Sequence, residues 1–447
     1  MRNLNLPVAH KHHFRKKAIR DPLYGFIDVS DLELKIIDSE VFRRLLSIKQ
    51  LSHAYVVYPT AMHSRFEHSL GTMHIADRMA QELELSIDDT KDVRLTALLH
   101  DIGHGPFSHL FESSIEKINP EQSDPHEKIS QIIIGEDLEL GHLLGDTKSR
   151  IINLLKTELG FDNPESLPAS IISSGLDADK LDYLRRDSHY VGVAYGQFDL
   201  ARVLHNLSTT TNRSQVVISS GGKDALENYR LARYLMHIQV YKHHARLAAD
   251  SMFRKALDIA IHEEGVIDKN LLKFSTSSKN KSFLNFYKTL DDYSIYQKIM
   301  ENEKSKSSKK ILSNIQKRRL LKRACDFTPD ALNKNEDVAT QLMKKTQEKL
   351  DGIATDIAKS LHLKPHEVIF YKSQIDMNLY KRGEILVKHR DEILDLNNAS
   401  PFTIKDPDVI RYYIFGPADE LTRKSIAKKA ASELGLEPAS ISYLKQN

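Results

Sequence analysis

The feature that most constrains the fold of this chain is the three- and four-residue spacing of apolar positions in its first 265 residues. Between residues 32 and 51, one helical stripe holds Leu34, Ile37, Val41, Leu45 and Ile48. The same periodicity recurs over residues 66–84, 91–101, 126–140, 147–159, 178–187 and about 224–264. Such spacing predicts helices that each bury one face, so this region is expected to be mostly α-helical.

The remaining sequence predicts other kinds of structure. QVVISSGGKD, residues 215–224, joins β-branched residues to a glycine turn and predicts a small hairpin. Ser-, Lys- and Asn-rich sequence from about 275 to 318 predicts exposed loops around a helix at 290–301. The segments FTPDALNKN, EVIFYKSQID, GEILVKH and VIRYYIFGP then predict short strands before a last helix at 418–434. The expected fold is mainly α, a helical core with a smaller α+β C-terminal lobe.

These patterns divide the chain into four parts. We expect a basic N-terminal arm at residues 1–16, a helical domain at 17–265, a linker or helical insertion at 266–319 and the α+β lobe at 320–447. The arm contains HKHHFRKK, which could bind nucleotide or nucleic acid. A solvated terminus explains it as well, and we assign it no function.

Composition excludes several functional classes. With 64 Lys and Arg against 61 Asp and Glu, the formal charge is +3, which disfavours a dedicated nucleic-acid binder. The single cysteine, Cys325, can form neither an internal disulfide nor a cysteine zinc site. The sequence contains no secretion signal and no apolar stretch of the ~18 residues that a spanning helix needs. We expect a cytoplasmic protein without a membrane partner.

Histidines give the first functional indication, because only four of the 21 lie beyond residue 250. The densest segment is LTALLHDIGHGPFSHLFE, residues 95–112, in which glycine and proline end a helix and leave His100 and Asp101 at its buried end. Imidazole and carboxylate together suit Mn²⁺, Fe²⁺, Zn²⁺ or Ni²⁺, or Mg²⁺ if carboxylates dominate. His68 and Asp179 are candidates for two further ligands. A lone His-Asp pair in a core, however, often serves only to satisfy its own hydrogen bonds.

The arrangement resembles the HD-domain phosphohydrolases, whose metal is held by His, then His-Asp, then a distant Asp. The resemblance is closest to the SAM-and-HD-domain deoxynucleoside triphosphate triphosphohydrolases and their prokaryotic relatives. It rests on RDPLYGFIDV, IKQL, SRFEHSLG, LLHDIGHGPFSH, the HE pair at 126–127 and DADKLDYLRRDS, and more loosely on YKHHARLAADSMF. It covers about residues 17–260 and implies an HD domain with a metal at His68, His100, Asp101 and Asp179.

Three histidines are available to protonate a leaving oxygen: His104, His109 and His126. The resemblance implies that His109 is the general acid. Glu112, one helical turn later, could orient a neighbouring imidazole, which leaves His104 and His126 to stabilise phosphate charge. The alternative is that all three are surface polar residues in a turn-rich segment.

The resemblance also implies a substrate site. Its phosphate contacts would be Arg65, Lys180 and Arg233, and its sugar and base contacts Gln50, Leu51, Tyr183, Asp187 and Tyr241. Asp179, Tyr183 and Asp187 share one helix face, and Arg233, His237 and Tyr241 share another. Arg186 and Arg230 are assigned instead to exposed charged faces. SSGGKD lacks the pattern of a Walker loop and is interpreted as a hairpin turn.

Regulation is expected to depart from the animal branch. Asp38 is retained, but Leu46 and Arg43 occupy positions where that branch has arginine and glutamine, so guanine-specific activation should be weakened. Lys17 and Arg43 could still hold the phosphates of another nucleotide activator. We also expect no sterile-alpha-motif domain before the HD core.

The sequence thus predicts an enzyme that hydrolyses dNTPs to deoxynucleoside and triphosphate and assembles as a homo-oligomer, a dimer or tetramer. One alternative is a phosphodiesterase or nuclease that uses the same metal on other nucleotides or single-stranded nucleic acid. Another is a non-catalytic nucleotide-sensing scaffold.

Overall fold

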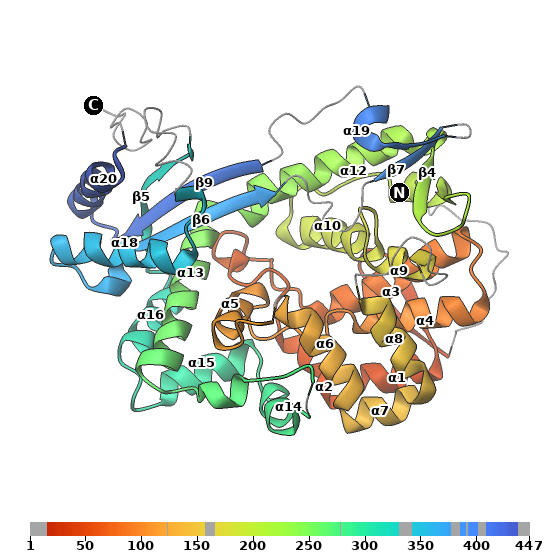
Figure 1. Cartoon of the computed structure of the whole chain (residues 1–447), viewed down its shortest axis with the longest axis horizontal. Coiled ribbons are helices and arrows are strands. Elements are labelled where there is room, and N and C mark those ends of the chain that lie inside the picture. The colour runs from red at the N-terminus through yellow and green to blue at the C-terminus, as the bar shows by residue number, and fades with distance from the viewer. Residues whose placement is uncertain are drawn as a thin grey trace.

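The computed structural model of this chain describes residues 16–122, 124–156, 166–277, 279–329, 342–376, 385–389, 392–400 and 408–436. Helices from the N-terminal half (red to yellow) form the body of the molecule, whereas β6, β9, α18 and α20 gather at one end (Figure 1). Residues 1–15, which make up nearly all of the predicted arm, lie outside the described residues.

The first described elements are strands that the sequence did not predict. β1 (Lys17–Asp21) and β2 (Gly25–Val29) pair antiparallel, with Lys17 opposite Val29. Gly25 has a φ of 78°, a backbone conformation that glycine adopts at little cost. The hairpin sets Asp21 and Tyr24 against the helical core, where both contact the site described below.

The prediction of one helix over residues 32–51 is wrong. This segment forms α1 (Asp31–Ile37), α2 (Glu40–Arg43) and the 3-10 turn η1 (Arg44–Ser47). The break occurs at Ser39, whose backbone is extended (φ −65°, ψ 149°) and whose hydroxyl donates to Ile36 O at 2.6 Å. Such local side-chain bonds compete with the helix.

Three helices position the candidate site and confirm the predicted helices at 66–84, 91–101 and 178–187. They are α3 (Arg65–Glu82), α4 (Ile87–Leu99) and α10 (Ala178–Val191), and α3 packs on both of the others. Gly71 permits the close approach of α3 to α10, because a Cβ there would lie 2.0 Å from Asp182 Oδ1.

Shorter helices surround this group. They are η2 (Ala54–Val56), α5 (His109–Ile118), α6 (Pro125–Glu136), α7 (Leu138–Leu144), η3 (Gly145–Thr147), α8 (Lys148–Leu155), α9 (Ser166–Ile172) and α11 (Leu200–His205). The predicted helix at 126–140 breaks at Asp137, whose carboxylate accepts from Leu140 N at 3.0 Å and caps α7. Beyond residue 156, the predicted helix at 147–159 lies outside the described residues.

A hairpin forms near residue 215, but not at the predicted turn. β4 (Val216–Ser219) pairs antiparallel with β3 (Leu207–Thr209), so the connecting turn precedes β4. The glycines instead form the 3-10 turn η4 (Ser220–Gly222), and the interpretation of SSGGKD as a hairpin turn is therefore wrong. Gly222 lies tightly against Asn206, since a Cβ there would be 2.5 Å from Asn206 Cβ.

The predicted helix at 224–264 is divided at Lys242 and His243. It comprises α12 (Lys223–Leu235), the π-helical turn η5 (Met236–Tyr241), α13 (His244–Asp258) and the π-helical turn η6 (Ile259–Glu263). π-Helical turns occur frequently at functional sites, and η5 contains His237 and Tyr241.

Residues 266–319 confirm the predicted helix at 290–301, but the flanking sequence, predicted as exposed loops from about 275 to 318, forms further helices. They contain η7 (Lys269–Leu272), α14 (Lys281–Tyr287), α15 (Asp292–Glu301) and α16 (Ser307–Gln316). Their Lys residues are exposed except for the half-buried Lys288, but Tyr287, Ile295 and Leu312 are buried in the main core. Amphipathic helices therefore account for the polar composition.

The C-terminal lobe is α+β, as predicted. β5 (Lys322–Phe327), β9 (Asp408–Gly416) and β6 (Ile369–Asp376) form an antiparallel sheet in the order β5-β9-β6. α18 (Gln347–Ser360) and α20 (Glu420–Leu434) contribute to its separate hydrophobic core, and a short 3-10 turn, η9 (Pro365–Glu367), precedes β6. The observed α20 confirms the predicted last helix.

The chain also returns to the helical body. β7 (Leu386–His389) pairs parallel with β4 and antiparallel with β8 (Glu392–Asp395), and α19 (Leu396–Ala399) follows. This sheet crosses the proposed boundary at residue 320, and the domain boundaries remain predictions. Among the described residues, no helix is both long and apolar enough to cross a bilayer.

Candidate functional site

The four predicted metal ligands converge from three helices. His68 projects from α3, His100 and Asp101 follow the end of α4, and Asp179 lies in the first turn of α10. His68 Nε2 lies 3.0 Å from Asp179 Oδ1 and 3.5 Å from Asp101 Oδ2, and His100 Nε2 lies 3.3 Å from Asp101 Oδ1. The structure thus brings all four residues into one cluster.

His68, His100 and Asp179 place ligand atoms within 4.8 Å of one another, as a shared divalent cation requires, while Asp101 pairs with Arg65 beside them. His68 Nδ1 donates to Asp182 Oδ2 at 2.9 Å and His100 Nδ1 donates to Ala97 O at 2.7 Å, which directs both Nε2 atoms toward the carboxylates. His100 Nε2 is buried without a well-oriented hydrogen bond. Metal-ligating histidines are held in this way, and two imidazoles with two carboxylates suit the ions considered above.

The electrostatics of the cluster favour a bound cation. Burial opposes the charged form of His68, but hydrogen bonds to Asp179 and Asp182 raise its pKa to about 10. Burial also opposes ionisation of Asp101, yet Arg65 and the nearby imidazoles hold its pKa well below the usual range. A buried group of carboxylates draws in positive charge, which a metal ion would supply.

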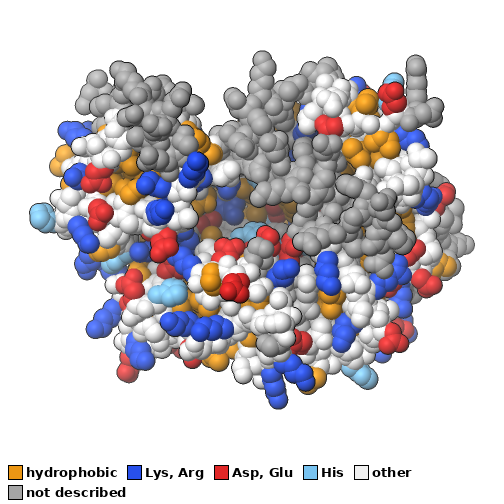
Figure 2. All heavy atoms as spheres, viewed as in Figure 1, with side chains coloured by type: hydrophobic (Ala, Val, Ile, Leu, Met, Phe, Trp, Pro, Cys, Tyr) orange, Lys and Arg blue, Asp and Glu red, His pale blue; other side chains and the backbone are white. Residues whose placement is uncertain are grey.

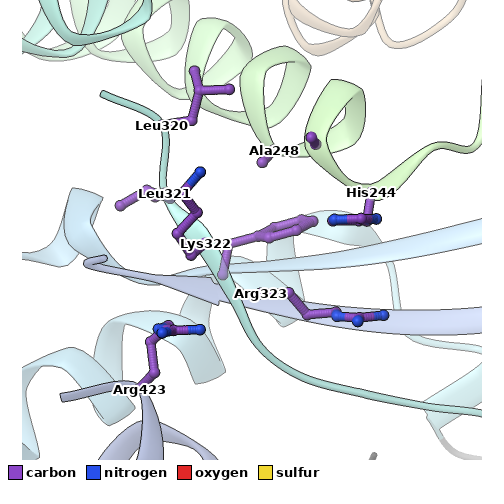
Figure 3. Close-up of a pocket in the computed structure, with 9 residues that line it drawn as sticks. His244, Ala248, Leu320, Leu321, Lys322, Arg323 and Arg423 are labelled. Carbon is purple, nitrogen blue, oxygen red and sulfur yellow. The ribbon is translucent and has the colours of Figure 1, made fainter. Parts of the chain in front are cut away.

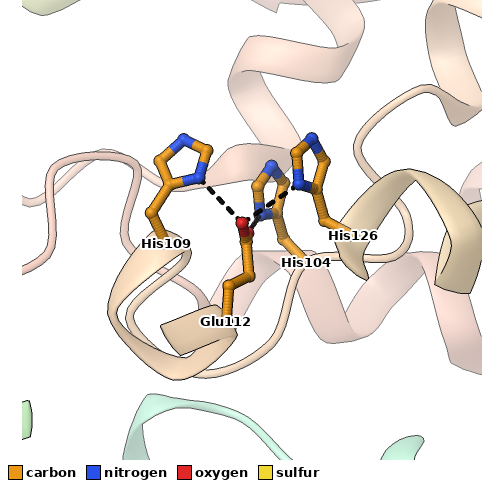
Figure 4. Close-up of side chains that lie close together, drawn as sticks. All are labelled: His104, His109, Glu112 and His126. Carbon is orange, nitrogen blue, oxygen red and sulfur yellow. Dashed lines mark hydrogen bonds and ion pairs between the residues drawn. The ribbon is translucent and has the colours of Figure 1, made fainter. Parts of the chain in front are cut away.

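A second cluster centres on one carboxylate. Glu112 in α5 lies between three imidazoles whose Nδ1 atoms all point toward it (Figure 4). The distances from the carboxylate oxygens of Glu112 are 2.6 Å to His104, 3.0 Å to His109 and 3.1 Å to His126. The side chain of His109 is 70% exposed, whereas His104 is buried.

The two clusters are in contact, since His104 Nε2 lies 3.3 Å from Asp101 Oδ1. Burial and the neighbouring Arg65 lower the pKa of His104 to about 4. Burial opposes the charged form of His126 as well, but Glu112 raises its pKa above the ordinary value. The stacked rings of His104 and His126, 4.3 Å apart, therefore differ in their tendency to hold a proton.

Glycine at position 103 makes this second cluster possible. A Cβ on Gly103 would lie 2.1 Å from the carbonyl oxygen of His126 and 2.4 Å from Ser130 N. Ser130 Oγ accepts from Gly103 N at 2.9 Å and donates to His100 O at 3.0 Å. The segment that follows the metal ligands is thus packed directly against α6, which positions His126.

A row of aromatic rings extends from the metal ligands toward η5. The centroid of His68 lies 6.5 Å from that of Tyr183, which lies 6.3 Å from that of Tyr241. Tyr241 in turn lies 5.1 Å from His237 and donates its hydroxyl to Asp187 Oδ2 at 2.7 Å. The predicted sugar- and base-contacting residues of α10 and η5 therefore face one another.

The other predicted contacts lie around this row. Arg65 pairs with Asp101 and donates from Nε to Ser108 Oγ at 2.7 Å, while Lys180 pairs with Asp177. Burial raises the pKa of Tyr183, and the buried Arg233 nearby opposes that rise. Gln50 N donates to His63 O at 3.0 Å, and Leu51, which follows it, is buried.

Arginines 186 and 230 do not lie on exposed faces, contrary to the prediction. Arg186 is fully buried and pairs with Asp182 at 2.8 Å and with Asp21 at 2.9 Å. Arg230 is also buried and donates to Asn397 Oδ1 at 2.8 Å. Each faces the packed side of its helix because a carboxylate or amide from a distant segment accepts its hydrogen bonds.

Two supporting residues were not singled out from the sequence. His63 Nε2 lies 2.8 Å from Asp187 Oδ1, and its ring stacks on Tyr190. Asp182 accepts from His68 and from the hydroxyl of Tyr24 at 2.7 Å. The four-residue spacing of Asp182 and Arg186 was an available signal for an ion pair, but no local pattern marks His63.

The predicted regulatory residues occupy the surface of the N-terminal segment. Arg43 Nη1 lies 3.8 Å from Asp38 Oδ1, both side chains are exposed, and Lys17 begins β1. Elsewhere, a cavity of 180 Å³ lies between α13 and the C-terminal lobe, where β5, β9 and α20 line it (Figure 3). Its wall combines basic groups with an apolar base and is lined by His244, Ala245, Ala248, Leu320, Leu321, Lys322, Arg323, Phe415 and Arg423.

Two protein-family models match consecutive parts of this chain. The HD domain matches residues 65–187, and the HD associated region matches residues 198–439. The first match contains all the residues of the metal and Glu112 clusters.

Individual relatives agree with these matches. An uncharacterized protein of Methanocaldococcus jannaschii is 39% identical over 257 residues, 57% of this chain and 52% of that protein. The deoxynucleoside triphosphate triphosphohydrolase SAMHD1 homolog of Dictyostelium discoideum is 31% identical over 359 residues, 77% of this chain and 64% of that protein. The matches thus span between about half and two thirds of these relatives.

A solved structure of a phosphohydrolase from Bacteroides thetaiotaomicron superposes with a TM-score of 0.71 at 27% identity. The superposition covers 90% of this chain and 99% of that one. With the HD-associated match covering more than half of its length, this chain belongs to the HD-domain phosphohydrolases that carry an HD associated region, and its relatives include proteins named deoxynucleoside triphosphate triphosphohydrolases.

Proposed function

We propose that this chain hydrolyses deoxynucleoside triphosphates to deoxynucleoside and inorganic triphosphate. The observation that carries the proposal is the continuity of the site, in which the metal ligands contact the Glu112 cluster on one side and the tyrosine row on the other. The first group suits phosphoryl chemistry, the second proton transfer and the third an aromatic-walled sugar site. A nucleotide carries the groups for all three.

The four ligands His68, His100, Asp101 and Asp179 would hold the divalent ion, of which Mn, Fe, Zn, Ni and Mg are candidates. When bound, such an ion supplies Lewis acidity toward a phosphoryl oxygen and toward the attacking water. Arg65, Lys180 and Arg233 add positive charge for the phosphates, and His237 on η5 lies near Arg233. Water adds to the α-phosphorus as the bond to the 5′-oxygen breaks.

The leaving 5′-oxygen requires a proton, and His109 is proposed to donate it. Glu112 holds His109 Nδ1 at 3.0 Å, which leaves the other ring nitrogen to face a substrate. His104 and His126 share the same carboxylate and are proposed to stabilise charge on the phosphate oxygens. Glu112 thus orients all three imidazoles.

The tyrosine row is proposed to select the sugar. Tyr183 and Tyr241 would pack against the 2′-carbon and leave no space for a 2′-hydroxyl. Asp187 already accepts from Tyr241 and pairs with His63, yet a carboxylate has further lone pairs for a 3′-hydroxyl, to which Gln50 would also bond. Leu51 would contact the base.

A substrate panel tests this proposal. The metal-loaded chain is incubated with each dNTP, each NTP, a cyclic dinucleotide and single-stranded DNA, and the products are separated by chromatography. Release of triphosphate from dNTPs is expected. Nucleoside monophosphates from DNA would instead indicate a nuclease, and no turnover with any of the five metals would favour a nucleotide-sensing scaffold.

Assembly and activation are proposed on family resemblance. A homo-oligomer would be a dimer or tetramer, and light scattering with and without nucleotide measures its size. Lys17, Asp38 and Arg43 are the proposed contacts of an activating nucleotide.

A further inference from the structure

Two segments of the candidate site are joined by one buried carboxylate. Asp292, the first residue of α15, accepts from Phe107 N at 2.6 Å through one oxygen and from Lys49 N at 3.0 Å through the other. Its side chain is 1% exposed, and Lys49 Nζ lies 3.3 Å from it. Lys49 and Phe107 lie 58 residues apart in the sequence, and the carboxylate of Asp292 holds the backbone N–H of both.

The segment around Phe107 has an unfavourable backbone. Phe107 and Ser108 have φ values of 54° and 55°, in the left-handed region that bulky residues rarely adopt. Such conformations persist where the surroundings impose them, and they cluster at functional sites. Here the strained pair directly precedes His109, the proposed general acid.

Two further hydrogen bonds tie this segment to the one that contains Gln50 and Leu51, and a third ties it to Arg65. Ser52 Oγ donates to Phe107 O at 2.9 Å, and Ser108 Oγ donates to Lys49 O at 3.2 Å. Arg65 Nε donates to Ser108 Oγ at 2.7 Å, while its guanidinium pairs with Asp101. Together these hydrogen bonds form a continuous path from Asp292 in α15, through the Lys49 and Phe107 segments, to Asp101, a proposed metal ligand.

We propose that Asp292 is a positioning residue that fixes the spacing between the proposed sugar contacts and the proposed acid. It touches no substrate and acts through the backbone of Lys49 and Phe107. Asparagine cannot replace it fully, because the amide offers one acceptor where two N–H groups require two. The inference rests on the proposed function only in assigning substrate contact to Gln50, Leu51 and His109.

The test compares Asp292→Asn with Asp291→Ala. Asp291 is the neighbouring residue and caps α15 by accepting from Ser294 N at 2.7 Å, with no bond to Lys49 or Phe107. Both variants remove a helix-end interaction and should lower the melting temperature. Three properties are measured: amide exchange at Lys49 and Phe107, bound metal, and kcat with KM over a range of pH.

For Asp292→Asn we expect amide exchange at Phe107 and Lys49 to become at least about 10-fold faster, with the metal content unchanged. We expect kcat to fall about 100-fold and the pH profile to shift, because a displacement of about 1 Å has that effect on an aligned acid. Asp291→Ala should leave all of these within about 2-fold of the wild type. Should Asp292→Asn not fold, Ser52→Ala removes a bond to the same loop and should change exchange and kcat in the same direction.

Equal kcat in the two variants, unchanged exchange at Phe107, or loss of metal in Asp292→Asn would each overturn the inference. A wild-type chain that hydrolyses no dNTP would refute the proposed function alone. Amide exchange, and turnover of whichever phosphoester the chain does hydrolyse, would still decide the role of Asp292.

Discussion

Replacement of Asp182 by asparagine should weaken metal binding although Asp182 is not a proposed ligand. Its carboxylate is fully buried and accepts from His68 Nδ1 at 2.9 Å, Tyr24 Oη at 2.7 Å and Arg186 Nε at 2.8 Å. An asparagine keeps the shape but turns one acceptor into a donor, and it removes the negative charge that strengthens the His68 imidazole as a ligand. Loss of such a supporting contact lowers metal affinity by about 10- to 100-fold, or about 1.4–2.8 kcal/mol.

The chain offers a matched control for this substitution. Asp21→Asn weakens the other ion pair of Arg186, at 2.9 Å, but leaves the contact with His68 intact. Both variants should reduce the free energy of unfolding by about 1–3 kcal/mol, measured in urea. Titration with Mn²⁺ against a competing chelator should show weakened binding for Asp182→Asn alone. Equal Mn²⁺ affinities in both variants and the wild type would refute the role assigned to Asp182.

Three further predictions concern the ligands, the acid and stability. Asp101→Ala should abolish both bound metal and turnover, and a full equivalent of metal by mass spectrometry would exclude Asp101 as a ligand. His109→Ala should retain the metal but lower kcat by about 100-fold, and an unchanged rate would move the acid role to another group. Burial, with Arg78 and Arg94 nearby, lowers the pKa of His74 to about 4, so the unfolded chain takes up a proton below about pH 6.5 that the folded chain does not. The contribution of neutral His74 to the free energy of unfolding should therefore be fully present above about pH 6.5 and should fall by about 1–3 kcal/mol toward pH 4. Urea unfolding of His74→Gln should show a smaller decrease over the same pH range.

Residues in compact local motifs could be predicted from the sequence. His100 and Asp101 lie together where glycine and proline end a helix. Asp179, Tyr183 and Asp187 recur at four-residue steps, so they share one helix face. In each case the local sequence alone indicates that the residues lie close together. The fold class followed in the same way from helical periodicity in the first half and β-branched runs in the second. The structure keeps these residues together because α3, α4 and α10 pack as the periodicity implies.

Interactions between distant segments could not be predicted in this way. His63 forms a hydrogen bond with Asp187, 124 residues away in the sequence, and Tyr24 forms one with Asp182, 158 residues away. Asp292 lies in the predicted helix at 290–301 and contacts Phe107, 185 residues away, and no local pattern marks that contact. Helix breaks were missed for a different reason, since Ser39 ends a helix by one side-chain bond that does not disturb the apolar spacing. Each of these depends on tertiary contact or local geometry rather than on sequence periodicity.

The parallel pairing of β7 with β4 has a mechanical consequence. It gives the C-terminal region a second attachment to the helical body, besides the chain that enters β5. β4 leads through η4 directly into α12 and η5, which contain Arg233, His237 and Tyr241. β7 therefore borders the strand that leads into the proposed phosphate and sugar contacts, and a displacement of β7 would act on that strand first.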